Sequence, residues 1–202
     1  MNAFLIDMDG TIVDSHLVVE SSWTAFAERH GLDPAEVIEY CHGRPAIATT
    51  RHYLGDGPEA DQAAADMATL EEGISEEIVE IVGARDFISS IPDGQWALVT
   101  SAGRELATRR LTLVGIPLPE VMICSEDITH GKPHPEPFLL GAERLGVDPT
   151  DCTVLEDSDS GVRAGLAAGC RVVVVGSMET FDGQLRRVTD LADVTASSIQ
   201  EG

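Results

Sequence analysis

Positive charge is scarce in this sequence, and lysine is almost absent. The 202 residues include 35 Asp and Glu against 13 Lys and Arg, which gives a formal net charge of −22. A chain this acidic lacks the basic surface that binding to nucleic acid or to anionic membranes requires. Lys132 is the only lysine, and the other twelve basic residues are arginine. Any site for an anionic substrate must therefore create its positive field locally.

Long apolar runs and paired-cysteine motifs are also missing. No run reaches 18 apolar residues, which argues against a membrane-spanning helix, and the first residues lack the basic start of a signal peptide. The four cysteines have no CxxC spacing, and three lie in or beside predicted strands. We therefore expect free buried thiols in a reducing cytoplasm rather than disulfides or a metal–thiolate site. The sequence contains no repeats or low-complexity segments.

The first predicted strand ends in two acids. Apolar residues 3–6 run directly into Asp7-Met8-Asp9-Gly10-Thr11. Two carboxylates at the exit of a buried strand point into the crevice at the carboxyl end of an open α/β sheet, where such folds place their chemistry. Burying two acids side by side is costly unless a cation or a reaction needs them. The alternative is an acidic turn in which Asp9-Gly10 forms a hairpin.

Three later segments carry groups that complement these acids. Lys132 lies in a turn-rich segment, residues 129–135, and offers the compact charge that suits a position between two anions. A strand over 153–156 ends in Glu156 and Asp157, whose oxygens suit Mg²⁺, although acids there also favour the start of a helix. A strand over 96–100 ends in hydroxyl residues before a helix, a pattern typical of a phosphate pocket or of a simple helix cap.

Strands and helices alternate along most of the chain, with a helical interruption near its start. Four helices are predicted within residues 15–82, at 18–29, from 34, at 45–53 and at 59–82 with a break near Gly73. After residue 83, strands at 96–100, 121–124, 153–156 and 171–175 with helices between them predict parallel βα units, and residues 191–194 are a candidate edge strand. We predict an α/β fold, a Rossmann-like parallel sheet core (residues 1–14 and 83–202) with an inserted α-helical cap domain (residues 15–82).

In this order, the four motifs resemble those of the haloacid dehalogenase superfamily, and the resemblance covers nearly the whole chain. It implies that Asp7 is the nucleophile and Asp9 the general acid/base, and that Lys132 stabilises the nucleophile and the phosphate. It also implies Mg²⁺ as the cofactor, held by Asp7, Asp9, Glu156 and Asp157. Phosphate binding is expected at Thr100, Ser101 and Ala102.

The helical insertion resembles the small α-helical cap of one subfamily, which closes over the active site. Its segment His42-Gly43-Arg44 is predicted to contact the substrate, because an arginine on a cap loop can bind a phosphate or sugar hydroxyl bidentately. The alternative is a turn between helices with a solvated arginine. Ser15 and His16, at the expected hinge, are further candidates for substrate contact.

Two absences narrow the reaction within the superfamily. The predicted cap has no lysine, which excludes the Schiff-base chemistry of phosphonatases. Dehalogenases lack the second Asp and the metal, so the presence of Asp9 and Asp157 here argues against dehalogenation. β-Phosphoglucomutases carry a cap histidine at the position that Val19 occupies here, although His16 lies one turn earlier. The absence of a histidine at position 19 favours hydrolysis over the mutase reaction.

The segments 96–101 and 131–137 resemble those of sugar- and polyol-phosphate phosphatases, including the 2-deoxyglucose-6-phosphate and glycerol-phosphate enzymes. The cap segment 42–53 resembles that of bacterial hexose-phosphate phosphatases. We therefore predict a cytoplasmic, Mg²⁺-dependent phosphatase of small sugar or polyol phosphates, acting through an aspartyl-phosphate. We expect the protein to bind a small phosphorylated sugar or polyol, and neither nucleic acid nor a membrane. We expect a monomer or a weak homodimer. The alternatives are a phosphosugar mutase and a non-catalytic ligand-binding module.

Overall fold

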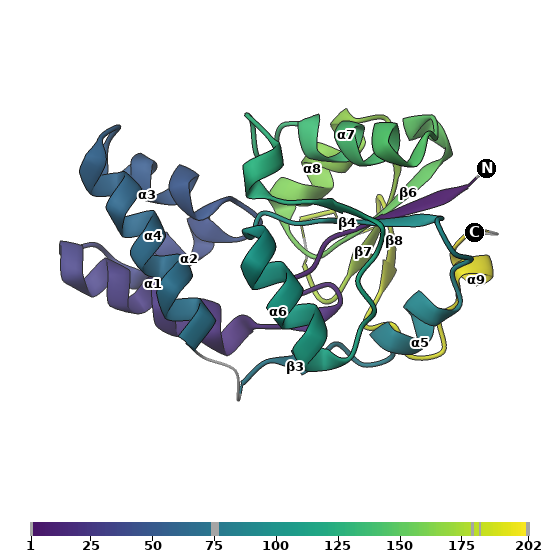
Figure 1. The fold of residues 1–202 in the computed structure, drawn as a ribbon, viewed down its shortest axis with the longest axis horizontal. Helices are drawn as coiled ribbons and strands as arrows, with labels where there is room; N and C mark the ends of the chain where they lie inside the picture. Colours follow the sequence, from purple (N-terminus) through teal and green to yellow (C-terminus); the bar gives the residue numbers. More distant parts are fainter. Residues whose placement is uncertain (1, 74–76, 179, 182, 201–202) are drawn as a thin grey trace.

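A sheet-containing lobe and a helical lobe lie side by side in the computed structural model (Figure 1). The structure describes residues 2–73, 77–178, 180–181 and 183–200. The helical lobe consists of α1 (His16–His30), α2 (Pro34–Cys41), α3 (Ala46–Leu54) and α4 (Pro58–Gly73). Within the described part of the chain, no helix combines the length and the apolar composition needed to span a membrane.

Parallel pairing organises the main sheet. Its strands are β1 (Ala3–Ile6), β4 (Trp96–Val99), β5 (Val121–Ile123), β6 (Cys152–Glu156), β7 (Arg171–Val175) and β8 (Arg186–Val188). They follow the order β5-β4-β1-β6-β7-β8, so β1 lies between β4 and β6. The carboxyl ends of these three strands are therefore neighbours, which is where an open parallel sheet places its ligand site.

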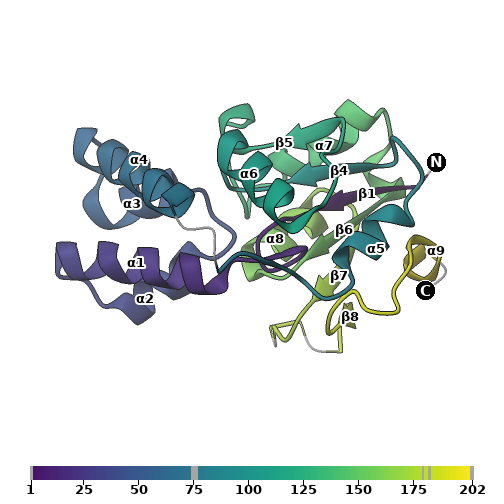
Figure 2. The ribbon, with the colours of Figure 1, turned by 60° about the horizontal axis from the view of Figure 1, so that its bottom comes forward.

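Helices cover both faces of this sheet (Figure 2), and an apolar layer lies between the helices and each face. Because side chains alternate along a strand, Phe4 and Ile6 of β1 pack toward one face and Leu5 toward the other. The first face carries α5 (Ala84–Ser89), α6 (Arg104–Val114) and α9 (Ala196–Gln200), and the second carries α7 (Glu136–Leu145) and α8 (Asp159–Ala167). Short 3₁₀ turns, η1 (Ser125–Asp127) and η2 (Pro149–Asp151), lie before α7 and β6. These layers confirm the predicted α/β class.

A separate small core holds the helical lobe together. Trp23 and Phe26 of α1 pack against Val37 of α2 and Met67 of α4. Asp33 caps α2 by accepting a hydrogen bond from the N–H of Ala35, as expected for an Asp-Pro start. The chain enters and leaves this lobe through an antiparallel pair, β2 (Val13–Asp14) and β3 (Val79–Glu80).

The fourth predicted helix is wrong beyond Gly73. Helix α4 ends at Gly73, and residues 79–80 form β3 instead of continuing the helix. The predicted break near Gly73 was therefore correct, while residues 74–76 lie outside the described residues. Pairing with β2, which is distant in sequence, overrides the local helical pattern at residues 79–80.

The predicted edge strand at residues 191–194 is also wrong. Arg186–Val188 forms the edge strand β8, while the N–H of Leu191 bonds to the carbonyl of Val82 and its side chain is buried. Burial of Leu191 under the sheet explains its apolar character without a strand. The four cysteines are free and buried, as expected.

Candidate active site

The lysine and the acids predicted from sequence meet at the carboxyl ends of β1 and β6. Lys132 Nζ lies 2.5 Å from Asp7 Oδ1, 2.7 Å from Glu156 Oε1 and 3.1 Å from the carbonyl oxygen of Val99. The three contacts use all three N–H donors of the ammonium group. Burial lowers the pKa of Lys132, but the two ion pairs outweigh it and raise the pKa, so the side chain stays charged.

The Glu156 side chain is fully buried, and both of its carboxylate oxygens accept hydrogen bonds. Its Oε1 accepts from Lys132, and its Oε2 accepts from the N–H of Asp157 and from the N–H and hydroxyl of Ser158, all at 2.9–3.0 Å. A Cβ on Gly161 would lie 1.7 Å from Oε1, so only glycine allows α8 to start this close to the carboxylate. Glu156 therefore fixes the position of the lysine ammonium.

When all three are ionised, the acids at this point carry more negative charge than Lys132 neutralises. Asp7, Glu156 and Asp157 offer ligand oxygens within 4.8 Å of one another. Against one ammonium, three ionised carboxylates leave two negative charges in excess. Burial raises the pKa of Asp7 to about 8 despite Lys132, with the neighbouring carboxylates adding to the rise, and burial also raises the pKa of Asp157. A divalent cation with oxygen preference, such as Mg²⁺, fits this donor set and its charge.

Within that group, Asp157 has the least occupied carboxylate. Its Oδ1 accepts a long hydrogen bond of 3.4 Å from the Thr11 hydroxyl. Gly10 adopts a φ of 80°, and a Cβ there would lie 1.9 Å from Asp157 Oδ2. The glycine of the first motif is thus needed both for the turn and for the space that the Asp157 carboxylate occupies.

Asp9, predicted as a metal ligand as well as the acid/base, is not one of this three-carboxylate group. Its Oδ1 accepts from Arg110 Nη1 and from the Ser15 hydroxyl, both at 2.7 Å. Arg110 Nη2 lies 2.8 Å from Glu71 Oε2 on α4, so one guanidinium links Asp9 to the helical lobe. Burial raises the pKa of Glu71, and Arg110 partly offsets that rise.

Arg110 and Glu71 are the charged groups that sequence analysis missed. The buried face of α6 comprises Leu106, Ala107, Arg110, Leu111 and Val114. An arginine on the apolar stripe of a helix signals a buried partner, so Arg110 was detectable from the period of that helix. No comparable signal marked Glu71, because the sequence pattern predicts an exposed side chain for an acid near the end of an acidic helix.

A cavity of about 320 Å³ lies over the acids, between the two lobes. Lys132 and Glu156 are buried beside Asp7 and do not line it. Of the predicted site residues, those that line it are Asp7, Asp9, Ser15, His16, His42, Gly43, Arg44, Thr100, Ser101, Ala102 and Asp157. Its other walls include Val19 and Trp23 of α1, Ile47 of α3 and Leu106 of α6.

The turn after β4 faces both Asp7 and the helical lobe. Thr100 is buried, and its hydroxyl oxygen accepts from the N–H of Ala102 at 3.1 Å. The Ser101 hydroxyl donates to the carbonyl of Gly43 at 2.9 Å. Ser101 is therefore engaged with the other lobe in this structure.

The loop between α2 and α3 is seated on the sheet lobe. The Ser160 hydroxyl donates to the carbonyl of His42 at 3.0 Å, and a Cβ on Gly43 would lie 2.2 Å from the Ser158 hydroxyl oxygen. Gly43 also has a φ of 70°, a backbone conformation that favours glycine. The loop therefore closes one side of the cavity by close backbone contact.

Arg44 and His42 reach the cavity in different ways. The Arg44 guanidinium donates to the carbonyl of Tyr40 at 2.7 Å and lies 4.4 Å from the centre of the Tyr40 ring. His42 packs edge-on against His16, with ring centres 5.9 Å apart. Burial and the neighbouring His16 lower the pKa of His42, which favours its neutral form.

The fold is of the α/β class, with an acidic site at the carboxyl ends of its central parallel strands. Over residues 1–169 the chain matches the family described as haloacid dehalogenase-like hydrolase. The chain therefore belongs to that family.

Among known relatives, Hexitol phosphatase A from Escherichia coli is 42% identical over 178 residues, covering 86% of this chain and 82% of that protein. Glycerol-1-phosphate phosphohydrolase 1 from Saccharomyces cerevisiae is 32% identical, covering 90% and 76%. The solved β-phosphoglucomutase from Clostridium difficile superposes with a TM-score of 0.86 over 100% of this chain and 96% of that chain. At 22% identity, this likeness shows the fold alone.

Proposed function

We propose that this protein is a Mg²⁺-dependent phosphatase that hydrolyses small sugar or polyol phosphate monoesters through an aspartyl-phosphate intermediate. The observation that carries the proposal is the group of Asp7, Lys132, Glu156 and Asp157 at the base of a cavity. Membership of the hydrolase family supports it, as do two relatives whose names specify a hexitol phosphatase and a glycerol-1-phosphate phosphohydrolase.

In the proposed first step, Asp7 attacks the substrate phosphorus. Lys132 holds Asp7 Oδ1, which leaves Oδ2 to form the new P–O bond while the bond to the substrate alkoxide breaks. Bound by Asp7 and Asp157, with Glu156 close by, Mg²⁺ would neutralise charge between the carboxylates and the phosphate dianion. Thr100 and the N–H groups of the turn after it would hold the phosphoryl oxygens.

Asp9 moves the protons in this scheme. Its Oδ1 accepts from Arg110 and Ser15, so Oδ2 would carry the proton of the carboxylic acid and pass it to the departing alkoxide. The resulting carboxylate then takes a proton from water, whose oxygen attacks phosphorus. The aspartyl P–O bond breaks, which regenerates Asp7 and releases phosphate. Atoms and charges balance over the two steps as hydrolysis of one ester bond.

The helical lobe supplies the substrate-selective wall in this proposal. We take residues 15–82 as a cap on a core formed by residues 1–14 and 83–202. A cavity of about 320 Å³ with polar groups such as His42 and Arg44 and apolar walls such as Trp23 suits one small substrate. The free thiols support a cytoplasmic location.

A phosphosugar mutase is the second candidate, because β-phosphoglucomutase shares the fold. The residue against it is Val19, which lines the cavity and by the resemblance stands where the mutases carry a cap histidine, although His16, one turn earlier on α1, lines the same cavity. An apolar side chain there cannot take the place of that polar group. Hydrolysis is therefore the preferred reaction.

The test is phosphate release from sugar, polyol and nucleotide monophosphates, with Mg²⁺ and with EDTA, including glucose 1-phosphate with its bisphosphate activator. We expect Mg²⁺-dependent release concentrated on hexose or polyol phosphates. Asp7→Asn should abolish release, while Asp86→Asn, an exposed aspartate on α5, should not change it. Isomerisation of glucose 1-phosphate without phosphate release would replace the proposal by the mutase. Unchanged turnover in Asp7→Asn would refute the nucleophile.

A further inference from the structure

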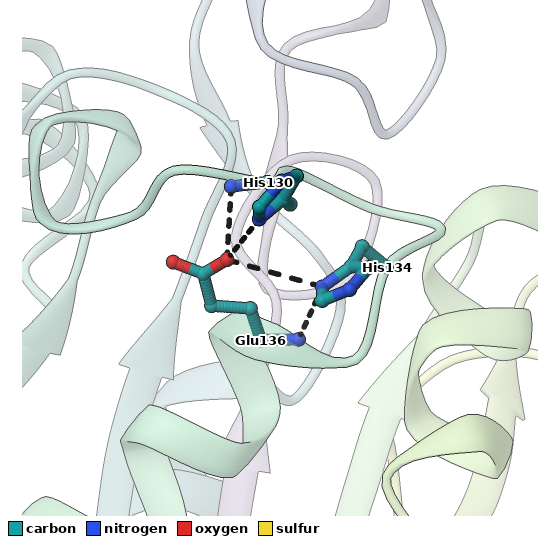
Figure 3. A group of neighbouring side chains, drawn as sticks. All are labelled: His130, His134 and Glu136. Carbon is teal, nitrogen blue, oxygen red and sulfur yellow. Dashed lines mark hydrogen bonds and ion pairs between the residues drawn. The ribbon is translucent and has the colours of Figure 1, made fainter.

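A second group of metal-binding side chains lies on the segment that carries Lys132. His130, His134 and Glu136 gather on the outside of this segment, at the start of α7 (Figure 3). One candidate ligand atom from each residue lies within 4.8 Å of the other two. None of the three lines the cavity over Asp7, so they are not part of the site described above.

The donor atoms lie close to the spacing that a small transition-metal ion requires. Both imidazoles direct Nδ1 toward Glu136 Oε2, at 2.8 Å from His130 and 3.9 Å from His134. A tetrahedral ion with bonds of about 2 Å separates its ligand atoms by roughly 3.3 Å, a value that lies between these two distances. The two rings lie 4.7 Å apart between centres. Small movements of exposed side chains are therefore enough to place the three donors around one ion.

Backbone hydrogen bonds hold Glu136 in place. Its Oε1 accepts from the N–H of Thr129 at 2.7 Å, and its Oε2 accepts from the N–H of His130 at 3.0 Å. The Thr129 bond, together with the His130 contacts, lowers the pKa of Glu136 and keeps it ionised. A carboxylate has about four lone-pair positions, so it can keep these bonds and still bind a cation. The carboxylate ligand is thus positioned in advance.

The proton between His130 and Glu136 is the group that a metal ion would displace. At 2.8 Å, His130 Nδ1 donates this proton to Oε2, and the N–H of Glu136 donates to His134 Nδ1 at 3.2 Å. A bound cation would take both nitrogen lone pairs and one carboxylate lone pair. With 62% and 51% of the two histidine side chains exposed, water completes the coordination.

We propose that His130, His134 and Glu136 form a binding site for a Zn²⁺-like divalent transition-metal ion, separate from the Mg²⁺ site at Asp7. Two imidazoles and a carboxylate select Zn²⁺, Co²⁺, Ni²⁺ or Cu²⁺, whereas Mg²⁺ prefers oxygen ligands throughout. The net charge of −22 attracts cations of every kind, so the donor set decides which of them binds here. This inference is independent of the reaction that the cavity performs.

The test measures Co²⁺ and Zn²⁺ binding with Mg²⁺ in excess, so that the carboxylates near Asp7 are occupied. Titration calorimetry gives the Zn²⁺ stoichiometry and affinity, and visible absorption of Co²⁺ reports nitrogen ligands. The variants are His130→Gln and His134→Gln, singly and together. His52→Gln, which removes an exposed histidine on α3, is the matched control.

We expect one Zn²⁺ per chain in the wild type and in His52→Gln. Loss of either imidazole should weaken binding by at least the factor, on the order of 10- to 100-fold, that loss of an outer-shell partner costs, and the double variant should lose the Co²⁺ absorption. Equal Zn²⁺ binding by the wild type and the double variant would overturn the proposal and assign the ion to the acids near Asp7. Absence of Zn²⁺ binding by the wild type would show that the three side chains share only protons.

Discussion

Arg110 and Asp9 form a 2.7 Å ion pair between helix α6 and the turn that follows β1. The Arg110 side chain is only 3% exposed, and its second partner, Glu71, belongs to α4 in the helical lobe. The residue proposed to move protons is therefore held by a cation that also contacts the other lobe. Separation of the lobes would remove Glu71 and alter the charge around Asp9.

The first prediction concerns this arginine as a positioning residue. Arg110→Lys retains a positive charge but cannot reach two carboxylates in the same planar geometry. We expect kcat to fall on the order of 10- to 100-fold with a smaller change in KM, because the Asp9 carboxyl loses the partner that orients it for proton transfer. Arg109→Lys, an exposed neighbour on α6, is the control. Equal kcat and KM for the two variants would show that Arg110 does not position Asp9.

The second prediction is that Lys132→Arg is inactive although it conserves charge. The ammonium fits between Asp7, Glu156 and the carbonyl of Val99, and it lies 5.2 Å from the centre of the Phe138 ring. A planar guanidinium is too large for this buried space, so Asp7 would be displaced. We expect kcat to decrease by about 100-fold or more, measured as phosphate release. Arg163→Lys at the surface of α8 should retain activity, and near-wild-type turnover of Lys132→Arg would contradict the role of the lysine.

The third prediction tests the contact of the α2–α3 loop with the sheet lobe. A Cβ at residue 43 would lie 2.4 Å from the Ser160 hydroxyl oxygen, on a backbone with a φ of 70°. In Gly43→Ala, strain of about 1–2 kcal/mol should displace the loop from the sheet lobe. We expect KM to rise roughly tenfold with a smaller effect on kcat. Gly31→Ala tests the left-handed backbone alone, because φ there is 67° and no atom lies within 4 Å of the added Cβ. The same increase in KM in both variants would assign the effect to backbone strain in general.

The fourth prediction follows from the buried thiols. Burial raises the pKa of Cys41 and Cys170 to about 12 and that of Cys124 and Cys152 to about 11. At pH 8 these thiols should therefore react with iodoacetamide far more slowly in the native protein than in denaturant. Above pH 9 the unfolded chain loses thiol protons that the folded chain keeps, so stability must fall as the pH rises toward 11. Urea unfolding at pH 8 and pH 10 measures the change in stability, which should be a decrease. Rapid alkylation of the native protein at pH 8 would contradict the predicted protection of the thiols.

The sequence by itself determined the class of fold and the chemical groups at the centre of the site. Alternation of apolar runs with acids at their ends fixed which side chains leave the sheet at its carboxyl edge, because parallel strands end on the same side. The pattern therefore predicted that Asp7, Thr100 and Asp157 lie at one edge of the sheet. Lys132 was also predictable from sequence, because it is the only lysine and arginine does not offer the same compact charge.

Tertiary structure alone decided which of these groups contact one another. Strand order brings β1 between β4 and β6, so Lys132, far away in the chain, can bond to Asp7 and Glu156 together. Pairing with β2 turned residues 79–80 into a strand, and the approach of α4 gave Arg110 its second carboxylate. These outcomes depend on contacts between distant segments, whose free energy is absent from any local pattern. Local sequence therefore specified which groups are present, and packing specified which of them interact.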